Sequence, residues 1–267
     1  MATTKAGGGK APVKFHVASG DKGGVGKSFL ALSLIDYLDG RGEEVVVLEA
    51  DKFNPDVARM YKNSLPCYSV DLTNENGWME VMDAVIKHPN ATFVMSCPAG
   101  IGGFLETHLP SFKSFLTKHN KTPMELALWW VMNPQHDSVN LLAEAMRRYG
   151  NEFATVRVVC NTHFSDNKPD AFFLWDESPL RAQLEKDGGM TLYLEGLNLR
   201  VVTKLFDPRK IIPFSDASDA ALGEQVGLTE SERFKLTNWR ERQALQFGHA
   251  FAQPRTQAAP APAAAEA

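Results

Sequence analysis

Seven consecutive residues, Lys-Gly-Gly-Val-Gly-Lys-Ser at 22–28, limit what this chain can fold into more than any other part of its sequence. Alternating apolar residues at 13–17 indicate a short strand before them, and residues 29–38 have the pattern of an amphipathic helix. In that context the glycines let consecutive backbone N–H groups point towards a phosphate at the positive end of the helix. The sequence therefore predicts a phosphate-binding loop, in which Lys27 neutralises the β- and γ-phosphates of a nucleotide and the Ser28 hydroxyl binds Mg²⁺.

The front of this loop departs from the common pattern GxxxxGK[ST]. Asp21 stands where the first glycine is expected, and Lys22 is too far from the phosphates of its own loop to act as Lys27 does. The loop resembles the deviant Walker A motif of the ParA/MinD superfamily of ATPases, in which such a lysine contacts nucleotide bound to the partner subunit. The resemblance implies that the nucleotide is ATP, that a homodimer forms on ATP binding, and that Lys22 and Lys27 are catalytic. It implies nucleotide contacts from Asp21, Gly23, Gly24, Val25, Gly26, Lys27, Ser28 and Phe29.

The composition is that of one α/β domain with a large buried core, since the 267 residues are 44% hydrophobic and 22% charged. A net charge of -4 argues against a generally basic nucleic-acid binder but leaves a local basic patch open. Three isolated cysteines without CxxC spacing suit a reducing compartment rather than a disulfide framework or a zinc site. We see neither a membrane-spanning apolar run nor a signal-peptide core, and we expect a cytoplasmic protein.

The two ends of the chain differ from the rest in composition. Residues 1–12 are rich in glycine and residues 253–267 are rich in proline and alanine, which predicts disordered tails. A single P-loop ATPase domain is expected between them at 13–252, including a C-terminal helix. We find no internal repeat in the sequence, so we do not expect a tandem ATPase.

Short apolar runs alternate with helical patterns along this domain. Strands are predicted at residues 14–19, 44–49, 92–96, 126–132, 155–161 and 201–205. Helices are predicted at residues 28–39, 76–87, 104–118, 138–149, 177–186, 216–223 and 230–251. The alternation predicts a doubly wound α/β fold, a mostly parallel sheet with helices on both faces. Ligands of such sheets bind at the carboxyl ends of the strands.

The second predicted strand runs into an acidic segment that contains Glu49, Asp51 and Asn54. One interpretation is a solvated acidic loop. In the ParA/MinD superfamily this strand ends in a DxD motif whose second aspartate orients the attacking water; Asp51 matches that aspartate and Glu49 stands in place of the first. The resemblance implies that Asp51 is catalytic and close to the metal, and that Asn54 belongs to the same switch loop. A carboxylate there can hold water in line for phosphoryl transfer.

The third predicted strand ends in Ser96-Cys97-Pro98-Ala99-Gly100, which resembles the DxPAG segment of the superfamily. The resemblance implies a nucleotide-dependent switch at Pro98, Ala99 and Gly100. Ser96 replaces the aspartate that holds a metal-bound water, and a neutral hydroxyl makes a contact about half as strong as a carboxylate does. ATP binding is expected to survive this change, whereas hydrolysis is expected to be slow. The predicted Mg²⁺ site comprises Ser28, Asp51 and Ser96.

Two later segments are candidates for contact with adenine. Asn161 ends a predicted strand, at a place where the superfamily often reads the adenine edge with an amide, although a turn asparagine explains it equally well. Pro213 and Phe214 resemble the segment that packs near the base. These two residues either wall the adenine pocket or close the core.

The final helix interleaves basic and aromatic residues: Arg233, Phe234, Lys235, Trp239, Arg240, Arg242 and Phe247. Relatives of ParA use basic residues to hold non-specific DNA, so a DNA- or partner-binding face is one interpretation. Because glutamates dilute the charge, a solvated helix packed on its own domain is the other. The Ala/Pro tail beyond the helix is unlike a membrane anchor, and membrane contact is not expected.

The resemblance implies a nucleotide-switched dimeric ATPase that acts in plasmid partition or stability, conjugative transfer or cargo positioning. Its partners would be a protein activator or cargo adaptor and, as an open alternative, non-specific DNA of the nucleoid. Ser96 motivates a second class, an ATP-binding adaptor that hardly hydrolyses. A third class is a small-molecule kinase or ligase on the same loop, whose ATP use a substrate would accelerate.

Overall fold

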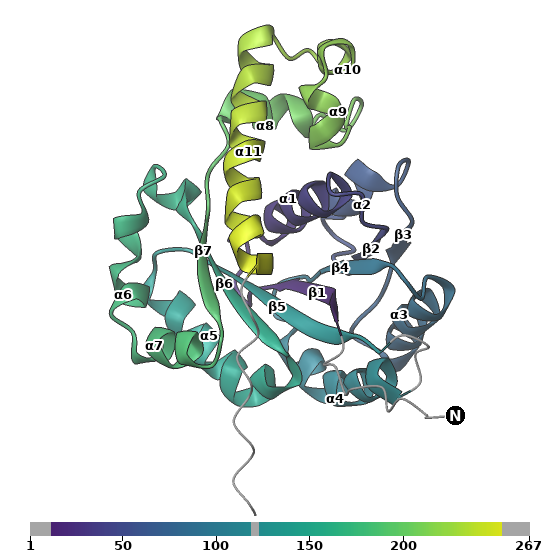
Figure 1. The fold of residues 1–267 in the computed structure, drawn as a ribbon, viewed down its shortest axis with the longest axis vertical. Helices are drawn as coiled ribbons and strands as arrows, with labels where there is room; N and C mark the ends of the chain where they lie inside the picture. The colour runs from purple at the N-terminus through teal and green to yellow at the C-terminus, as the bar shows by residue number, and fades with distance from the viewer. Residues whose placement is uncertain (1–11, 119–122, 253–267) are drawn as a thin grey trace, which may run out of the picture.

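A parallel sheet of seven strands forms the centre of the computed structural model, which describes residues 12–118 and 123–252 (Figure 1). The strand order is β3-β2-β4-β1-β5-β6-β7, and each neighbouring pair is parallel. The strands are β1 (Val13–Ser19), β2 (Val45–Glu49), β3 (Cys67–Ser69), β4 (Thr92–Ser96), β5 (Glu125–Met132), β6 (Thr155–Asn161) and β7 (Met190–Leu194). Apart from Pro12, the predicted tails lie outside the described residues.

Helices cover both faces of this sheet, as the doubly wound prediction requires (Figure 1). One face packs against α3 (Glu75–Lys87), α4 (Gly102–Lys118) and α5 (His136–Tyr149), and the other against α1 (Lys27–Asp39) and α11 (Glu230–Ala252). The shorter helices are α2 (Asp56–Tyr61), α6 (Phe173–Asp176), α7 (Pro179–Lys186), α8 (Leu199–Leu205), α9 (Phe214–Ser218) and α10 (Ala220–Gln225). The fold class predicted from the sequence is confirmed.

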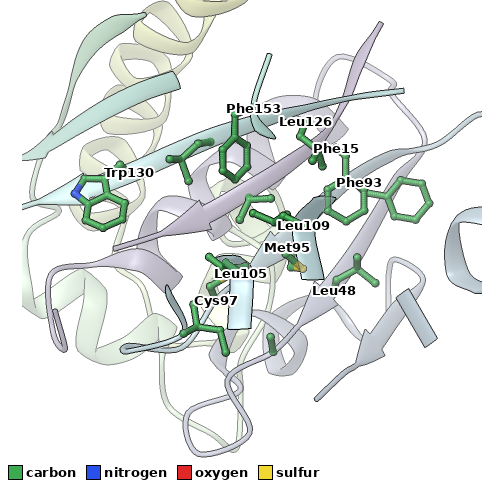
Figure 2. Close-up of a cluster of buried hydrophobic side chains, with 14 of the residues drawn as sticks. Phe15, Leu48, Phe93, Met95, Cys97, Leu105, Leu109, Leu126, Trp130 and Phe153 are labelled. Atoms are coloured by element: carbon green, nitrogen blue, oxygen red, sulfur yellow. The ribbon is translucent and has the colours of Figure 1, made fainter. Parts of the chain in front are cut away.

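The central strand β1 is buried on both faces from Phe15 to Ser19, in keeping with its position in the middle of the sheet. Phe15 stacks on Phe93 of β4 at 5.5 Å and meets Phe112 of α4 edge-on at 4.9 Å, whereas Ala18 packs against the α1 side. Figure 2 shows Phe15, Phe93 and Leu109 directed towards one another in the interior. Each such aromatic pair contributes about 0.5–1.5 kcal/mol beyond its buried area.

The strand predicted at 201–205 is wrong, because these residues lie in helix α8. Val201 and Leu205 are fully buried and stand four residues apart, which is helical spacing, and the Asn198 side chain caps the helix by accepting from Arg200 N. The last strand of the sheet is β7, where Leu192 and Leu194 alternate inwards.

The other departures concern short elements. Strands β3 and β7 and helices α2 and α6 have no counterpart among the predicted elements. The helix predicted at 216–223 is two helices, α9 and α10, which meet at Asp219. The carboxylate of Asp219 accepts hydrogen bonds from Ala221 N and Leu222 N and thereby begins α10.

The order of the strands brings three predicted segments together. Ser96 at the end of β4 is the register partner of Ala18 on β1 and of Glu49 on β2. The loop at 22–28, the segment after Glu49 and the segment after Ser96 therefore leave the same edge of the sheet side by side.

Candidate nucleotide-binding site

The phosphate-binding loop has a backbone that only glycine adopts easily. Gly24 has a φ of +73° and Gly26 a φ of +102°, both left-handed. A Cβ atom on Gly26 would lie 2.3 Å from Nδ2 of Asn161, whereas one on Gly23 would meet nothing within 4 Å. Gly26 is also the residue from which α1 begins, so the loop feeds its backbone N–H groups into the helix N-terminus.

Lys27 is 8% exposed and lies on the inside of this loop. Its Nζ donates to the carbonyl oxygen of Lys22 at 2.8 Å. Burial lowers the pKa of the ammonium, and the nearby Cys97, Asp51 and Asp21 act in the opposite direction. The loop therefore holds its lysine close to two of the predicted acidic site residues.

Lys22 is turned away from the loop towards the start of α5. Its Nζ lies 2.7 Å from Oδ2 of Asp137, and it also donates to Oε1 of Gln135. The hydrogen bond from Lys22 holds the pKa of Asp137 below its usual range. Both side chains are partly exposed, and the contact is made within one subunit.

Asp51 begins an exposed turn beside the loop. Its Oδ1 accepts from the backbone N–H of Phe53 at 3.1 Å and of Asn54 at 3.0 Å, the pattern of an Asx turn. Asp51 is half-buried, Asn54 is exposed, and the Phe53 side chain is 92% exposed. The turn thus presents one carboxylate towards the loop side and one aromatic ring to the outside of the molecule.

Glu49 lies beneath this turn and is 1% exposed. Its Oε1 accepts from Asp51 N at 3.1 Å, and its Oε2 accepts from Val57 N at 3.1 Å and Ala58 N at 3.3 Å. Burial raises the pKa of this carboxyl to about 7, although the three hydrogen bonds oppose the shift. From the sequence, Glu49 was identified only as the residue in place of the first aspartate.

The segment after β4 is bonded to the phosphate-binding loop. Cys97 N donates to the carbonyl of Ala18 at 3.0 Å, and Gly100 N donates to the carbonyl of Asp21 at 3.2 Å. The Ser96 hydroxyl is buried and has no hydrogen-bond partner within the described ranges. Burial raises the pKa of the Cys97 thiol to about 12, so it stays protonated and behaves as a small apolar group.

The donor set at this edge fits Mg²⁺ held partly by nucleotide. In the part of the chain that the structure describes, no group of three His, Cys, Asp or Glu side chains is arranged to hold a metal ion. Mg²⁺ commonly binds through one or two protein oxygens together with substrate phosphates, and hard oxygen donors suit it. The half-buried Ser28 and the unpartnered hydroxyl of Ser96 offer such oxygens.

A cavity of about 300 Å³ adjoins the loop on the side of β6, within the range of small-molecule pockets. Most of its wall was not predicted from the sequence, because His163, Phe164, Gly196, Leu197 and Leu199 lie outside the predicted elements and Val202 was placed in a strand. Its lining is largely apolar and comprises Gly24, Gly26, Phe29, Asn161, His163, Phe164, Gly196, Leu197, Leu199 and Val202.

The three residues predicted near adenine lie in different places. Asn161 lines the cavity, but its Nδ2 donates to the carbonyl of Val25 at 2.8 Å and its Oδ1 accepts from His163 N at 3.1 Å. Pro213 and Phe214 are buried, Phe214 packs against Phe29, and neither residue lines the cavity. Of the two alternatives that the sequence left open, their position is that of residues that close the core. Asn161 thus ties the phosphate-binding loop to β6.

The final helix α11 packs on its own domain through Trp239 and Phe247. Arg240 donates to Asp36 of α1 at 2.8 Å and Arg242 to Glu195 at 2.8 Å. These ion pairs neutralise two of the basic side chains on which the DNA-binding interpretation rests. None of the helices in the described ranges has the length and apolar character needed to cross a membrane.

Comparisons with known proteins place the chain by family and fold. No protein-family model matches the chain. Protein MobD of Acidithiobacillus ferrooxidans is 32% identical over 225 residues, which cover 84% of this chain and 92% of MobD. The cell division protein MinD of Aquifex aeolicus aligns with a TM-score of 0.50 and 15% identity over 85% of this chain and 97% of its own. A MinC:MinD complex from the same organism gives 0.51 and 13%, over 92% and 99%. At these identities the two structures establish the fold alone.

Proposed function

We propose that this chain, which belongs to the MobD family and to the ParA/MinD superfamily, is a slow ATPase that dimerises when it binds ATP and Mg²⁺. The observation that carries the proposal is the loop itself. Gly24 and Gly26 are left-handed and line a cavity of the size of a small-molecule pocket, and the buried Lys27 follows them directly in the chain, which supports phosphate binding at the loop and nucleoside binding beside it.

Within this proposal the loop from Asp21 to Phe29 binds the phosphates, and the cavity beside Asn161 takes the base. Lys27 leaves the carbonyl of Lys22 and pairs with the β- and γ-phosphates. The Ser28 and Ser96 hydroxyls and the Asp51 carboxylate would hold Mg²⁺, directly or through water, and the metal supplies charge neutralisation on the phosphates. Asp51 holds the attacking water in line.

We propose that Lys22 acts across the dimer, on nucleotide bound to the second subunit. Its present partners, Asp137 and Gln135, would have to release it. The segment Pro98 to Gly100 would move with the loop, because Gly100 N is bonded to the carbonyl of Asp21. Together with Asn54 it makes up the proposed switch.

For the cellular role, the relationship to MobD favours conjugative transfer among the roles that the sequence left open. We propose a cytoplasmic, nucleoid-associated ATPase that positions a cargo through a protein adaptor or activator, with non-specific DNA as a second partner. The ATPase rate would then rise on addition of that protein or of DNA.

Molecular mass and turnover, measured together, test the proposal. Light scattering after size exclusion would be recorded without nucleotide, with ADP, and with ATP plus Mg²⁺. A shift to twice the monomer mass with ATP alone, accompanied by slow phosphate release, is the expected result. A mass that is the same in all three conditions would contradict the switch.

A hydrolysis-poor adaptor is the second candidate. The neutral Ser96 hydroxyl, which has no hydrogen-bond partner among the residues that the structure describes, favours it. The same measurement separates the two. An adaptor would dimerise with ATP and release no phosphate over many hours.

A further inference from the structure

Glu49 is a buried carboxylate without a cationic partner among the residues that the structure describes. Taking a carboxylate out of water is costly unless hydrogen bonds or an opposite charge compensate for it. Its only compensation in the described contacts is the set of three backbone N–H donors, from Asp51, Val57 and Ala58. An apolar residue at the end of β2 would avoid this cost. The geometry of the three donors is therefore the feature that needs explaining.

The two oxygens of Glu49 reach opposite ends of one segment. Oε1 binds the N–H of Asp51, at the start of the segment 50–58, which we name the Asp51 loop. Oε2 binds Val57 and Ala58 in the first turn of α2, at its end. Pro55 precedes that helix and gives no side-chain cap, so Glu49 supplies the acceptors that a cap residue would normally provide.

The middle of the Asp51 loop, residues 52–54, is exposed. Its internal hydrogen bonds are those of the Asx turn at Asp51 and one from Asp56 N to the carbonyl of Asn54, at 2.8 Å. Two contacts near its start leave the loop: Ala50 N donates to the carbonyl of Ser96 at 3.0 Å, and Lys52 Nζ lies 2.8 Å from Oδ2 of Asp71. Neither of them holds the end of the loop at α2. Among the hydrogen bonds of the described residues, those of the Glu49 side chain alone join both ends of the loop to the last residue of β2.

We propose that Glu49 is a positioning residue, which clamps both ends of the Asp51 loop and so fixes where Asp51 stands relative to the phosphate-binding loop. The proposal rests on the ATPase function above and extends it to a buried residue that has no part in the binding roles proposed there. Asp51 is close enough to Lys27 for its charge to act on that ammonium. A displacement of the Asp51 loop would therefore alter the arrangement around the phosphates directly.

The clamp requires two acceptor oxygens on a side chain of this length. Glutamine offers one acceptor, and its NH₂ group would face an N–H donor at the other end of the Asp51 loop. Aspartate keeps both oxygens at the same separation but is one methylene shorter, so its carboxylate does not reach the donors that Glu49 reaches. Glu49→Gln and Glu49→Asp are thus both expected to open the loop, for different reasons. Because Glu49→Asp keeps the negative charge and Glu49→Gln removes it, the same effect in both variants would show that the clamp geometry, not the charge, holds the loop.

Amide hydrogen exchange in the absence of nucleotide tests the clamp, and single-turnover ATP hydrolysis tests its consequence. In both variants the exchange of the segment 50–58 is expected to rise about tenfold or more, while that of α1 (27–39) and β5 (125–132) stays unchanged. ATP affinity is expected to stay within about twofold, and the hydrolysis rate to fall by roughly 10- to 100-fold. Glu44→Gln, an exposed carboxylate just before the same strand, is the matched control and is expected to change neither reading.

Three results would overturn the proposal. Unchanged exchange at 50–58 would show that Glu49 does not hold the Asp51 loop. A rise of exchange throughout the protein would assign Glu49 to general stability. An opened loop with a normal hydrolysis rate would show that Asp51 does not depend on the clamp. A wild-type protein that hydrolyses no ATP would instead refute the proposed function, and the exchange of 50–58 would still decide the clamp.

Discussion

Lys22 Nζ and Asp137 Oδ2 lie 2.7 Å apart, so the lysine proposed to act on the partner's nucleotide is bonded within its own subunit. The pair joins the front of the phosphate-binding loop to α5 across 115 residues of sequence. Its two side chains are 30% and 54% exposed. A pair of this kind is worth about 0.2–1 kcal/mol, which is small enough for nucleotide binding to break.

Removing this pair should favour the dimer. Asp137→Ala removes the charged partner of Lys22 in both subunits and leaves only its hydrogen bond to Gln135, so the dissociation constant of the ATP-bound dimer is expected to fall roughly 2- to 30-fold. Sedimentation with ATP and Mg²⁺ measures it. Glu144→Ala removes an equally exposed pair, with Arg148, on the same helix and serves as the control. A dimer weakened by Asp137→Ala would show that the contact is not a restraint on Lys22.

Gly26→Ala is expected to abolish nucleotide binding. A Cβ there meets Asn161 Nδ2 at 2.3 Å, and its φ of +102° is strained for any other residue, at a cost of about 1–3 kcal/mol. Thermal melting and binding of a fluorescent ATP analogue measure the two effects. Gly23→Ala, which meets no atom within 4 Å, should leave the melting temperature near that of the wild type. Equal destabilisation by both variants would refute the steric argument.

Ser96→Asp is expected to raise ATP turnover, by roughly fivefold, because a carboxylate binds a metal-bound water more strongly than a hydroxyl does. The Ser96 hydroxyl has no partner among the described residues, so the substitution breaks no hydrogen bond seen there. Ser96→Ala, which offers no acceptor, should lower turnover or leave it unchanged. Phosphate release with saturating ATP and Mg²⁺ gives all three rates. A fall with aspartate would show that the missing carboxylate does not limit hydrolysis.

Glu232 should make the protein sensitive to acid. Its carboxylate accepts from Lys204 Nζ at 2.6 Å and from Thr229 N at 2.9 Å, and the bond from Lys204 lowers its pKa to about 2. Because the pKa in the folded state is below the usual 4.5, its stabilisation is complete above pH 4.5 and disappears as the pH falls towards 2. The melting temperature of Glu232→Gln should therefore differ from the wild type at pH 7 and approach it near pH 3. Glu230→Gln is the control. If the difference in melting temperature between Glu232→Gln and the wild type grew as the pH fell, the predicted pH dependence would be wrong.

The sequence predicted the centre of the fold and the parts of the site that belong to one local pattern. The strand before the loop, the loop glycines and the apolar runs of β4, β5 and β6 can each be recognised from a short stretch of consecutive residues. The edge strand β3 is only three residues long, and residues 201–205 carry an apolar run that period alone does not assign to a strand or a helix. Burial at Val201 and Leu205, a tertiary property, decided the question.

The contacts that position the site could not be predicted, because they join residues far apart in sequence. Asn161 was recognised as a residue at a strand end, yet nothing in the sequence indicated that its amide binds Val25, 136 residues away. The same holds for Lys22 and Asp137. Glu49 is a different case, since its partners lie within nine residues. Only the folded path of the Asp51 loop brings both of its ends to one carboxylate.

The exposed ring of Phe53 gives this protein a natural place for an optical reporter. All five tryptophans, Trp78, Trp129, Trp130, Trp175 and Trp239, are at most 2% exposed, so collisional quenchers such as acrylamide reach their indoles poorly. An indole introduced by Phe53→Trp would stand at a site that is 92% exposed and would emit at longer wavelength than the other five. Acrylamide would quench the fluorescence of this indole selectively, because the five buried tryptophans are shielded from the quencher. The quenched signal would therefore report the exposure of the Asp51 loop in real time.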